Sequence, residues 1–206
     1  PLYSSAASDV YKRQPVITSV PVETATEGVL YTYNVDATDP DEGDVITYSL
    51  TGAPSGMTID PSTGLIQWTP DYDVVKTAEG SRGFDLIVKA TDAQGASDEQ
   101  KVMITVKNVN RPPVVHSLVI VPDKPSTTDS LTCSYVYTDA DGDPESGSEI
   151  RWYMDGNLQE PFNDQRTVPS VTLSANQQWS FAVRPKDGMD FGELQKSGTV
   201  TIIAIN

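Results

Sequence analysis

Two acidic loops carry the residues of this sequence that are best suited to chemistry. Residues 38–44 read TDPDEGD and residues 138–144 read TDADGDP, so Asp39-x-Asp41 recurs at Asp139-x-Asp141, with Asp143 two residues further on. Several carboxylates on one short loop can hold a hard cation, because Ca²⁺ takes about six to eight oxygen ligands. The two copies lie one hundred residues apart, about the length of one antiparallel β-sandwich domain. The repeat predicts two domains of one plan, each with a candidate metal-binding loop.

Both loops also have a simpler interpretation as solvated turns, because Asp and Gly favour turn geometry. The segment 139–150 does not follow the EF-hand pattern, since Gly142 stands at its fourth position and Ile150 at its twelfth. Calcium binding here would therefore need oxygens from several loops that come together in the fold.

The composition excludes several classes of partner. The chain of 206 residues has a formal net charge of −15, which repels nucleic acid and anionic lipid and attracts cations. No stretch approaches the roughly 18 consecutive apolar residues of a membrane span. We therefore expect no nucleic-acid partner and no direct insertion into a membrane.

The sequence offers no catalytic constellation. His116 is the only histidine, and it has no serine or cysteine nucleophile motif near it, so we expect it on the surface of a strand. Carboxylate pairs of the kind used in glycoside hydrolysis can be chosen by chance from so many acids. Neither a glycine-rich phosphate loop nor a zinc-ligand spacing is present. We expect no enzyme activity and no catalytic residues.

Cysteine and tryptophan point to packing rather than reactivity. Cys133 is the only cysteine, so no internal disulfide can form, and we expect it to be a small buried apolar residue. Trp68, Trp152 and Trp179 are expected in the core. The alternative is a sugar-stacking platform, for which Trp68 and Tyr72 are the best candidates.

Apolar and polar residues alternate along most of the chain, which predicts β-strands and no helix. The residues 29–35 are a clear example, with Val29, Tyr31, Tyr33 and Val35 on one face. About seven short strands in the first half favour a β-sandwich. Further strands are expected at 45–50, 57–60, 65–68, 84–90 and 101–106, and then at 117–121, 130–137, 150–154, 167–173, 178–184 and 197–205.

The segment Asn108–Pro113, NVNRPP, marks the boundary between the two domains, because two prolines favour an extended, semi-rigid link. We expect domains at 15–110 and 111–206, cut from a longer array. Ser4–Gln14 is similar to a translated sequencing-adapter oligonucleotide, and a natural flexible tail is the alternative. Residues 1–14 are therefore expected to be an artefactual or disordered tail with no role in the fold.

Both domains also resemble known families. The stretches EGVLYTYNVDATDPDEGDVITYSL, APSGMTIDPSTGLIQWTP, FDLIVKATDAQG and ITVKNVNRPP resemble the cadherin-like domains of dystroglycan type, also called putative Ig domains, which are common in bacterial surface and secreted proteins. SLTCSY, DADGDPE, IRWYMDG and WSFAVRPKDG resemble a bacterial Ig-like repeat. The resemblances imply an all-β fold of two tandem Ig-like or cadherin-like antiparallel β-sandwiches joined by a short proline-rich linker.

The cadherin resemblance implies Ca²⁺ held at domain junctions. The linker departs from the family pattern, because Asn108 stands for a carboxylate and Arg111 puts a cation where an anion is expected. Fewer negative ligands predict one or two weak sites rather than a cluster of three ions. By position in the motifs, the implied metal ligands are Glu23, Asp39, Asp41, Asp71, Asp73, Asp92, Asn108, Asn110, Asp139, Asp141 and Asp143.

These observations favour a non-catalytic, calcium-binding adhesion or spacer module of a bacterial surface or secreted multidomain protein. Its expected location is extracellular or at the cell surface, and its expected partners are neighbouring β-sandwich domains of the same chain, with surface proteins or glycans as further candidates. The alternative is a carbohydrate-binding accessory module of a secreted polysaccharide-degrading enzyme, which requires exposed, coplanar aromatic rings. A spacer that binds no ion is a third possibility.

Overall fold

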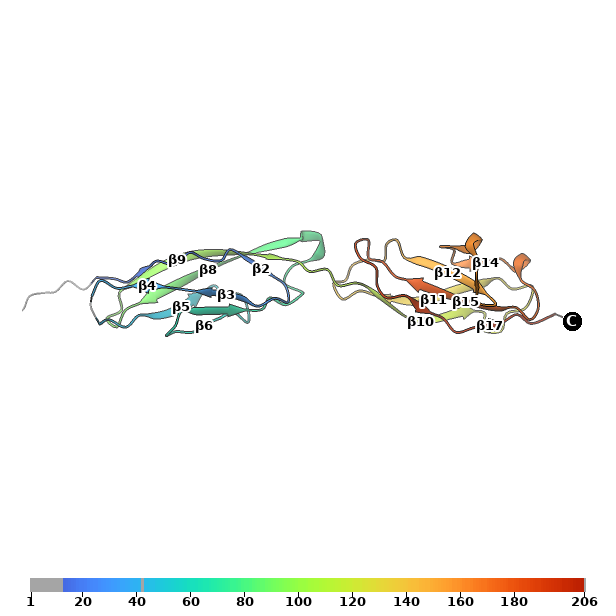
Figure 1. The fold of residues 1–206 in the computed structure, drawn as a ribbon, viewed down its shortest axis with the longest axis horizontal. Coiled ribbons are helices and arrows are strands. Elements are labelled where there is room, and N and C mark those ends of the chain that lie inside the picture. The colour runs from blue at the N-terminus through green and yellow to red at the C-terminus, as the bar shows by residue number, and fades with distance from the viewer. Residues whose placement is uncertain (1–12, 42, 206) are drawn as a thin grey trace, which may run out of the picture. The chain divides into compact units, whose positions relative to one another are not determined.

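The structure is a computed structural model that describes residues 13–41 and 43–205. The chain folds into two compact units that divide between Val109 and Asn110 (Figure 1). Residues 1–12 of the expected tail lie outside the described residues. None of the helices in the described ranges has the length and apolar character that crossing a bilayer requires.

Unit 1, up to Val109, is built from short strands and one 3-10 helix. Its elements are β1 (Val16–Ile17), β2 (Thr24–Thr26), β3 (Tyr31–Asn34), β4 (Ala37–Thr38), β5 (Thr47–Thr51), β6 (Thr58–Ile59), β7 (Leu65–Trp68), η1 (Thr77–Glu79), β8 (Ser81–Thr91) and β9 (Ser97–Lys107).

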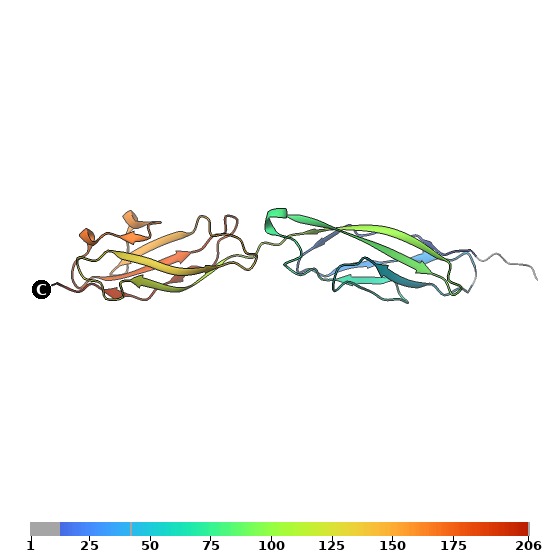
Figure 2. The ribbon, with the colours of Figure 1, turned by 180° about the vertical axis from the view of Figure 1, so that it is seen from behind.

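Two sheets enclose the core of unit 1. One has the strand order β2-β9-β8-β5 and the other β3-β7-β6, while β1 and β4 form a separate pair. The long antiparallel hairpin of β8 and β9 runs from Ser81 opposite Lys107 to Thr91 opposite Ser97, and Figure 2 shows it from behind. Ten residue steps of strand span about 33 Å, so the hairpin has its turn at one end of the unit and Lys107 at the other.

The core of unit 1 follows from strand alternation. Tyr31 and Tyr33 of β3 are buried, and the residues that follow each of them are exposed, because successive side chains of a strand point to opposite faces. Trp68 of β7 packs edge-on against Phe84 of β8, with the ring centroids 5.4 Å apart. The fully buried residues around them come from both sheets and include Val35, Ile66, Leu86, Val88, Val102, Ile104 and Val106.

Unit 2, from Asn110, has the same kind of architecture. Its elements are β10 (Val114–Val121), β11 (Leu131–Thr138), β12 (Glu149–Met154), β13 (Asn157–Leu158), η2 (Glu160–Phe162), β14 (Thr167–Val168), η3 (Ser170–Thr172), β15 (Gln178–Arg184), β16 (Gln195–Lys196) and β17 (Val200–Thr201).

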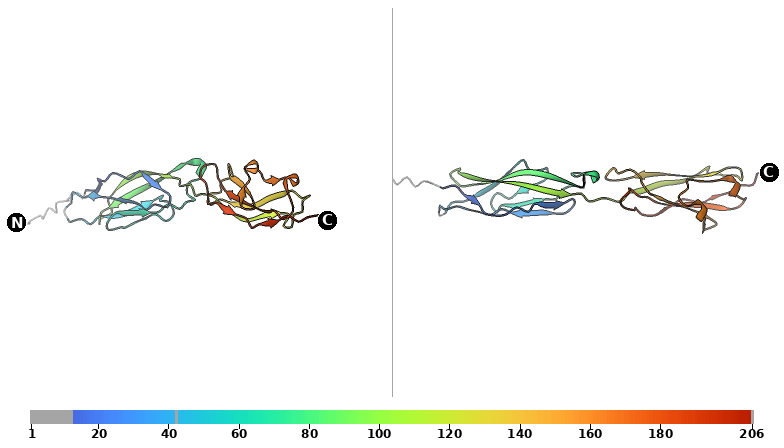
Figure 3. Two further views of the ribbon diagram at one scale, coloured as in Figure 1. Left: turned by 45° about the vertical axis from the view of Figure 1, so that its right-hand side comes forward. Right: turned by 90° about the horizontal axis from the view of Figure 1, so that it is seen from above.

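The strands of unit 2 also form two layers, which can be followed within that unit in Figure 3. One sheet has the order β10-β11-β14 and the other β13-β12-β15-β16, with β17 also paired to β15. Trp152 of β12 lies opposite Phe181 of β15, and their ring centroids are 5.3 Å apart. Both are fully buried, as is Leu131 of β11, so one apolar core fills the space between the sheets.

The prediction of an all-β fold is confirmed, and two expected strands, 65–68 and 178–184, have the predicted bounds. The expected strand 167–173 is wrong beyond Val168, because Pro169 lacks an N–H for the ladder and a 3-10 helix follows. The expected strand 197–205 is reduced to Val200–Thr201. The strands β1 and β2 were not predicted, because two or three residues carry no readable period.

Candidate cation-binding loops

The acidic loop of unit 2 begins directly after β11. Asp139 accepts two backbone hydrogen bonds at Oδ1, from the N–H of Asp141 at 2.7 Å and from the N–H of Asp143 at 3.2 Å. This turn wraps the backbone around one carboxylate, as Asp side chains commonly do. One carboxylate oxygen from each of the three aspartates lies within 4.8 Å of the others. The local sequence alone therefore brings three half-buried carboxylates together.

Several oxygens at this end of unit 2 are buried and lack a hydrogen-bond partner among the described residues. They are Oδ2 of Asp139, Oδ2 of Asp143 and Oδ1 of Asn110. A buried polar atom that has lost water without gaining a partner costs roughly 1–3 kcal/mol. Carboxylate and carbonyl oxygens are the ligands that Ca²⁺ prefers, so a cation would satisfy them.

The electrostatic field around this loop is strongly negative. The hydroxyl of Tyr137, at the end of β11, donates to the backbone oxygen of Asp143 at 3.3 Å. Burial, and to a smaller extent the negative charges of Asp139, Asp187, Glu145 and Asp143, together raise the pKa of Tyr137 to about 12. The part of this shift that comes from the four carboxylates indicates a negative local potential, which attracts positive charge.

Asp187 is a buried member of the same end of unit 2 that sequence reasoning missed. Its Oδ1 accepts from the N–H groups of Met189 and Asp190, both at 2.7 Å, and its Oδ2 accepts from Nδ2 of Asn110 at 2.9 Å. Burial raises the pKa of this carboxyl, but the hydrogen bonds outweigh burial and hold the pKa below its ordinary value. The available signal was the turn dipeptide Asp187-Gly188, which begins three residues after the end of β15.

Arg111 forms an ion pair with Asp141, one of the three aspartates of the loop. Its backbone N–H donates to Oδ2 of Asp141 at 2.7 Å and its Nε donates to Oδ1 at 2.8 Å. The guanidinium also donates to the backbone oxygen of Ala140 at 2.8 Å. The side chain of Asp141 is only 3% exposed, so this carboxylate is neutralised inside the protein.

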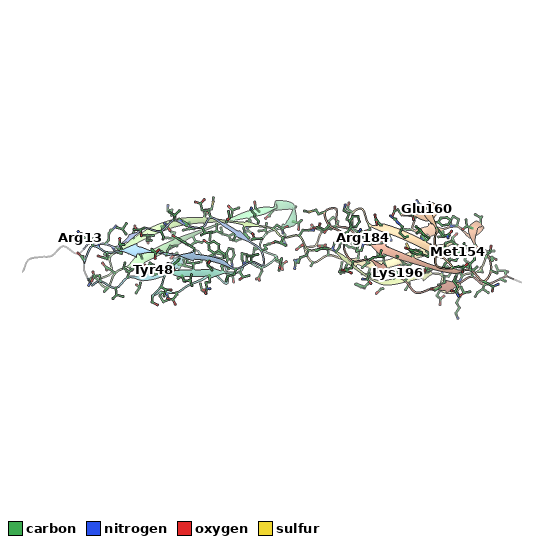
Figure 4. All side chains as sticks on the ribbon, in the orientation of Figure 1. Arg13, Tyr48, Met154, Glu160, Arg184 and Lys196 are labelled. Carbon is green, nitrogen blue, oxygen red and sulfur yellow. The ribbon has the colours of Figure 1, made fainter. Side chains whose placement is uncertain are left out.

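The acidic loop of unit 1 has the same construction. Asp39 accepts from the N–H of Asp41 at 2.8 Å, and one oxygen from each of Asp39, Asp41 and Asp44 lies within 4.8 Å of the others. Oδ2 of Asp39 is buried without a partner in the described ranges. Arg13, which Figure 4 labels where the chain enters unit 1, donates its backbone N–H to Asp41 at 2.7 Å. Arg13 belongs to the segment that the sequence assigned to the tail.

Asp92 lies at this same end of unit 1. Thr91, the last residue of β8, pairs with Thr47, the first residue of β5, so the turn after Thr91 and the acidic loop before Thr47 leave the sheet together. Oδ1 of Asp92 accepts from Gln94 and Ala96, while its Oδ2 is buried with no partner in the described part of the chain. The structure does not bring Asp92 near Asn108, which follows Lys107 at the opposite end of the hairpin.

Glu27 takes the position at the other end of unit 1 that the sequence assigned to Glu23. Glu27 is 1% exposed and accepts from Nδ2 of Asn108 at 3.0 Å and from the N–H of Val109 at 2.9 Å. β2 runs parallel to β9 with Thr26 opposite Lys107, so Glu27 reaches the end of the sheet and Glu23 lies about 13 Å back along the strand.

Three of the remaining predicted ligands, Asp71, Asp73 and Glu23, are exposed. Asp71 and Asp73 lie on the loop that leads to Val75, whose N–H donates to Glu27 at 2.8 Å. Asn110 is separated from Asn108 by one residue but bonds within unit 2, to Asp187 and to Asp190 at 2.8 Å.

The aromatic residues give little support to a sugar-stacking platform. Trp68 is 2% exposed in the core of unit 1, and Trp152 and Trp179 are buried in the core of unit 2. This confirms the expected core role of the tryptophans. Tyr72 is 40% exposed, whereas Trp68, the other candidate for sugar stacking, is buried. Cys133 is buried in the core as expected, and His116 is exposed on β10.

The residues fit a calcium ion in part. Asp139, Asp143 and Asn110 supply buried oxygens without a partner in the described chain, in a region that the charges of four carboxylates make negative. Asp141 and Asp41 already hold arginine. Because one aspartate of each loop is already paired with an arginine, the two loops offer fewer ligands to metal ions than their three carboxylates each would suggest.

Comparison with known proteins agrees with the resemblances found in the sequence. Residues 14–107 match the family described as "Putative Ig domain". Protocadherin Fat 4 of Mus musculus is 29% identical over 194 residues, covering 90% of this chain and 4% of that protein. Protocadherin-11 X-linked of Sus scrofa is 30% identical over 151 residues, covering 68% of this chain and 13% of that protein. The resemblance to Ig-like and cadherin-like domains is confirmed.

Two solved structures of cadherin domains match this chain over most of its length. Extracellular cadherin domains 1–5 of protocadherin gamma B2 give a TM-score of 0.49 at 18% identity, covering 93% of this chain and 39% of that one. Mouse cadherin-23 EC22–24 gives a TM-score of 0.48 at 18% identity, covering 93% of this chain and 65% of that one. The chain spans only 4% and 13% of the length of the two protocadherin sequences.

Proposed function

We propose that this chain is a non-catalytic adhesion or spacer segment of an extracellular or cell-surface protein, and that unit 2 binds Ca²⁺ at its acidic loop. The observation that carries the calcium proposal is the set of buried oxygens on Asp139, Asp143 and Asn110 that have no partner in the described residues. A bound ion would supply positive charge and draw these oxygens together.

The negative charge around the loop also supports this proposal. The pKa of Tyr137 is raised by burial and by four neighbouring carboxylates, among them Asp139, Asp187 and Asp143. Such a site attracts cations through the field of the whole loop. Asn110 donates to Asp187 and directly precedes Arg111, whose backbone N–H donates to Asp141, so Asn110 lies at the same end of unit 2 as the loop.

The adhesion and extracellular parts of the proposal rest on similarity. The relatives are named protocadherins, and the match covers 90% of this chain for the mouse protein. The neighbouring domains of the same parent protein are the proposed partners, as in any array of β-sandwich repeats. A bacterial parent protein is proposed because the sequence motifs resemble bacterial surface repeats.

Calorimetric titration of Ca²⁺ into the full chain in metal-free buffer tests the calcium proposal. We expect saturable binding with a Kd in the range of about 10⁻⁴–10⁻³ M that is typical of extracellular modules. The variant Asp139→Asn plus Asp143→Asn should lose this binding. Asp123→Asn changes charge at an exposed position of unit 2 and should keep it. A flat titration of the unmodified chain would overturn the proposal and leave a spacer that binds no ion.

A carbohydrate-binding role finds no specific observation in its favour. It would need an exposed platform, and Trp68 is in the core of unit 1. We therefore do not propose it as a second function.

A further inference from the structure

Two arginines hold the same position relative to the two acidic loops. Arg111 precedes the first residue of β10 by three residues, and Arg13 precedes the first residue of β1 by three residues. Both stand in the pattern Arg-x-Pro-Val. Each therefore lies where the chain enters its unit, beside the turn made by Asp139 or Asp39.

The contacts of the two arginines are similar, although Nε lies 2.8 Å from the Oδ1 atom of the aspartate for Arg111 and 3.5 Å for Arg13. The backbone N–H of each donates to Oδ2 of the second aspartate in its Asp-x-Asp, at 2.7 Å in both units. Each guanidinium faces Oδ1 of that carboxylate and donates to the backbone oxygen of the residue before it, at 3.0 Å for Arg13 and 2.8 Å for Arg111. Arg13 belongs to the segment that the sequence assigned to the tail, so the inference below is drawn for Arg111 alone.

Burial makes this pairing consequential. The side chain of Asp141 is 3% exposed and that of Asp41 is 10% exposed. A buried carboxylate needs a cation or hydrogen-bond donors, because transfer of a charge out of water is otherwise strongly unfavourable. A guanidinium is always positive in proteins and presents a fixed fork of donors that matches a carboxylate. Arginine thus satisfies an aspartate that a metal ion would otherwise satisfy.

We infer that Arg111 is a tethered cation that replaces a metal ion at Asp141. Both oxygens of Asp141 accept hydrogen bonds from Arg111 and are therefore unavailable to a metal ion. The oxygens of Asp139, Asp143 and Asn110 remain available. The calcium part of this inference rests on the function proposed above. The rest does not, since Arg111 neutralises Asp141 and fastens the entering chain whether or not calcium is present. The end of unit 2 that contains Arg111 and Asp141 should therefore stay folded when a chelator removes calcium.

The decisive comparison is Arg111→Gln against Lys124→Gln in the full chain. Both changes remove one positive charge from unit 2, and Lys124 is exposed. In EDTA, Arg111→Gln should lower the melting temperature of unit 2 by about 4–8 °C, because Asp141 is left buried without its cation. In calorimetry it should bind Ca²⁺ about tenfold more tightly than the unmodified chain, or bind one more ion, because Asp141 becomes a ligand. Lys124→Gln should do neither.

The double variant Arg111→Gln plus Asp141→Asn protects the test against misfolding of the single variant. It removes both charges, so its calcium affinity should stay within about threefold of the unmodified chain if Asp141 is not a ligand there. A clear loss of affinity in the double variant would overturn the inference. An unchanged calcium titration of the single variant would do the same, leaving Arg111 an ordinary structural ion pair.

Failure of the proposed calcium function is a separate outcome. If the unmodified chain does not bind Ca²⁺ but Arg111→Gln does, the tethered-cation inference stands and the proposed calcium function falls. If neither chain binds Ca²⁺, both fall, because freeing Asp141 has then not created a ligand.

Discussion

The carboxylate of Glu27 accepts a hydrogen bond from the backbone N–H of Val109 at 2.9 Å, although the two residues are 82 positions apart. The same carboxylate accepts from the N–H of Val75 at 2.8 Å and from Nδ2 of Asn108 at 3.0 Å. One buried side chain thus holds the polar loop after β7 and the segment that leaves β9. The end of unit 1 is therefore fastened by hydrogen bonds to a single buried carboxylate.

Replacing this carboxylate should destabilise unit 1 strongly. Glu27→Ala leaves the N–H groups of Val75 and Val109 and the amide of Asn108 without their acceptor, and each unsatisfied buried donor costs about 1–3 kcal/mol. We expect a loss of at least about 3 kcal/mol in the free energy of unfolding, measured by chemical denaturation of the full chain in EDTA.

Glu23→Ala is the matched control, because Glu23 is an exposed glutamate four residues earlier. Its effect should stay within about 0.5 kcal/mol, as for surface substitutions generally. Equal losses for the two variants would show that the hydrogen bonds of Glu27 do not fasten this end of the unit.

Two backbone segments of unit 2 approach each other so closely at Gly192 that no side chain fits there without a shift. A Cβ at this position would lie 1.8 Å from the backbone oxygen of Pro113 and 2.9 Å from Cγ of Pro185. The first of these contacts is with backbone, which can move only if the segment before β10 shifts. Gly192→Ala should therefore cost about 1–3 kcal/mol of unfolding free energy, as overpacking does. Thermal melting followed by tryptophan fluorescence checks this.

Gly198→Ala is the control for this substitution, since a Cβ there has no heavy atom within 4 Å. It should be neutral or slightly stabilising, because alanine reduces the entropy of the unfolded chain. A neutral Gly192→Ala would mean that residues 112 and 113 are not held against this loop in solution.

The single cysteine provides a probe of core opening. Cys133 is 2% exposed, and burial raises the pKa of its thiol above the ordinary value. The thiolate is the reactive form, so both effects slow modification. We expect native protein to react with a thiol reagent at least about a thousandfold more slowly than protein unfolded in denaturant, because labelling requires an opening of the core.

An exposed reference thiol sharpens that measurement. Ser174→Cys places a thiol at an exposed position of the same unit, and it should be labelled at nearly the rate of a model thiol. Rapid native labelling at Cys133 would contradict its placement in the core.

The strands and the core could be predicted from the sequence because they depend on alternation. The alternation along residues 29–35 correctly placed Tyr31, Tyr33 and Val35 in the core. It was wrong for Val29, which is 56% exposed because the strand begins only at Tyr31. The acidic loops were also predictable, because Asp39 and Asp139 organise their own turns within a few residues.

The contacts between distant segments could not be predicted in the same way. Glu23 directly precedes β2 and Glu27 directly follows it. Which of the two reaches the end of the sheet depends on the register of this three-residue strand against β9. The hydrogen bond between Asn110 and Asp187 joins residues 77 positions apart, which only the fold brings together. The cationic role of Arg111 was foreseen as a departure from a family pattern, but its bond to Asp141 required the fold.

The lowered pKa of Asp187 makes the stability of unit 2 depend on pH in a defined direction. Burial raises this pKa, but the bonds from Asn110, Asp190 and Met189 bring it below its ordinary value. The unfolded chain then binds the proton more readily, so this contribution is complete above the unfolded pKa of about 4 and is lost as the pH falls through the lower folded value. In EDTA, Asp187→Asn should be less stable than the unmodified chain near neutral pH, and the gap should narrow below about pH 4. Asp123→Asn, at an exposed position, controls for the change in net charge. A gap that stays constant from neutral pH into that acid range would contradict the assigned hydrogen bonds, because a purely steric loss does not titrate.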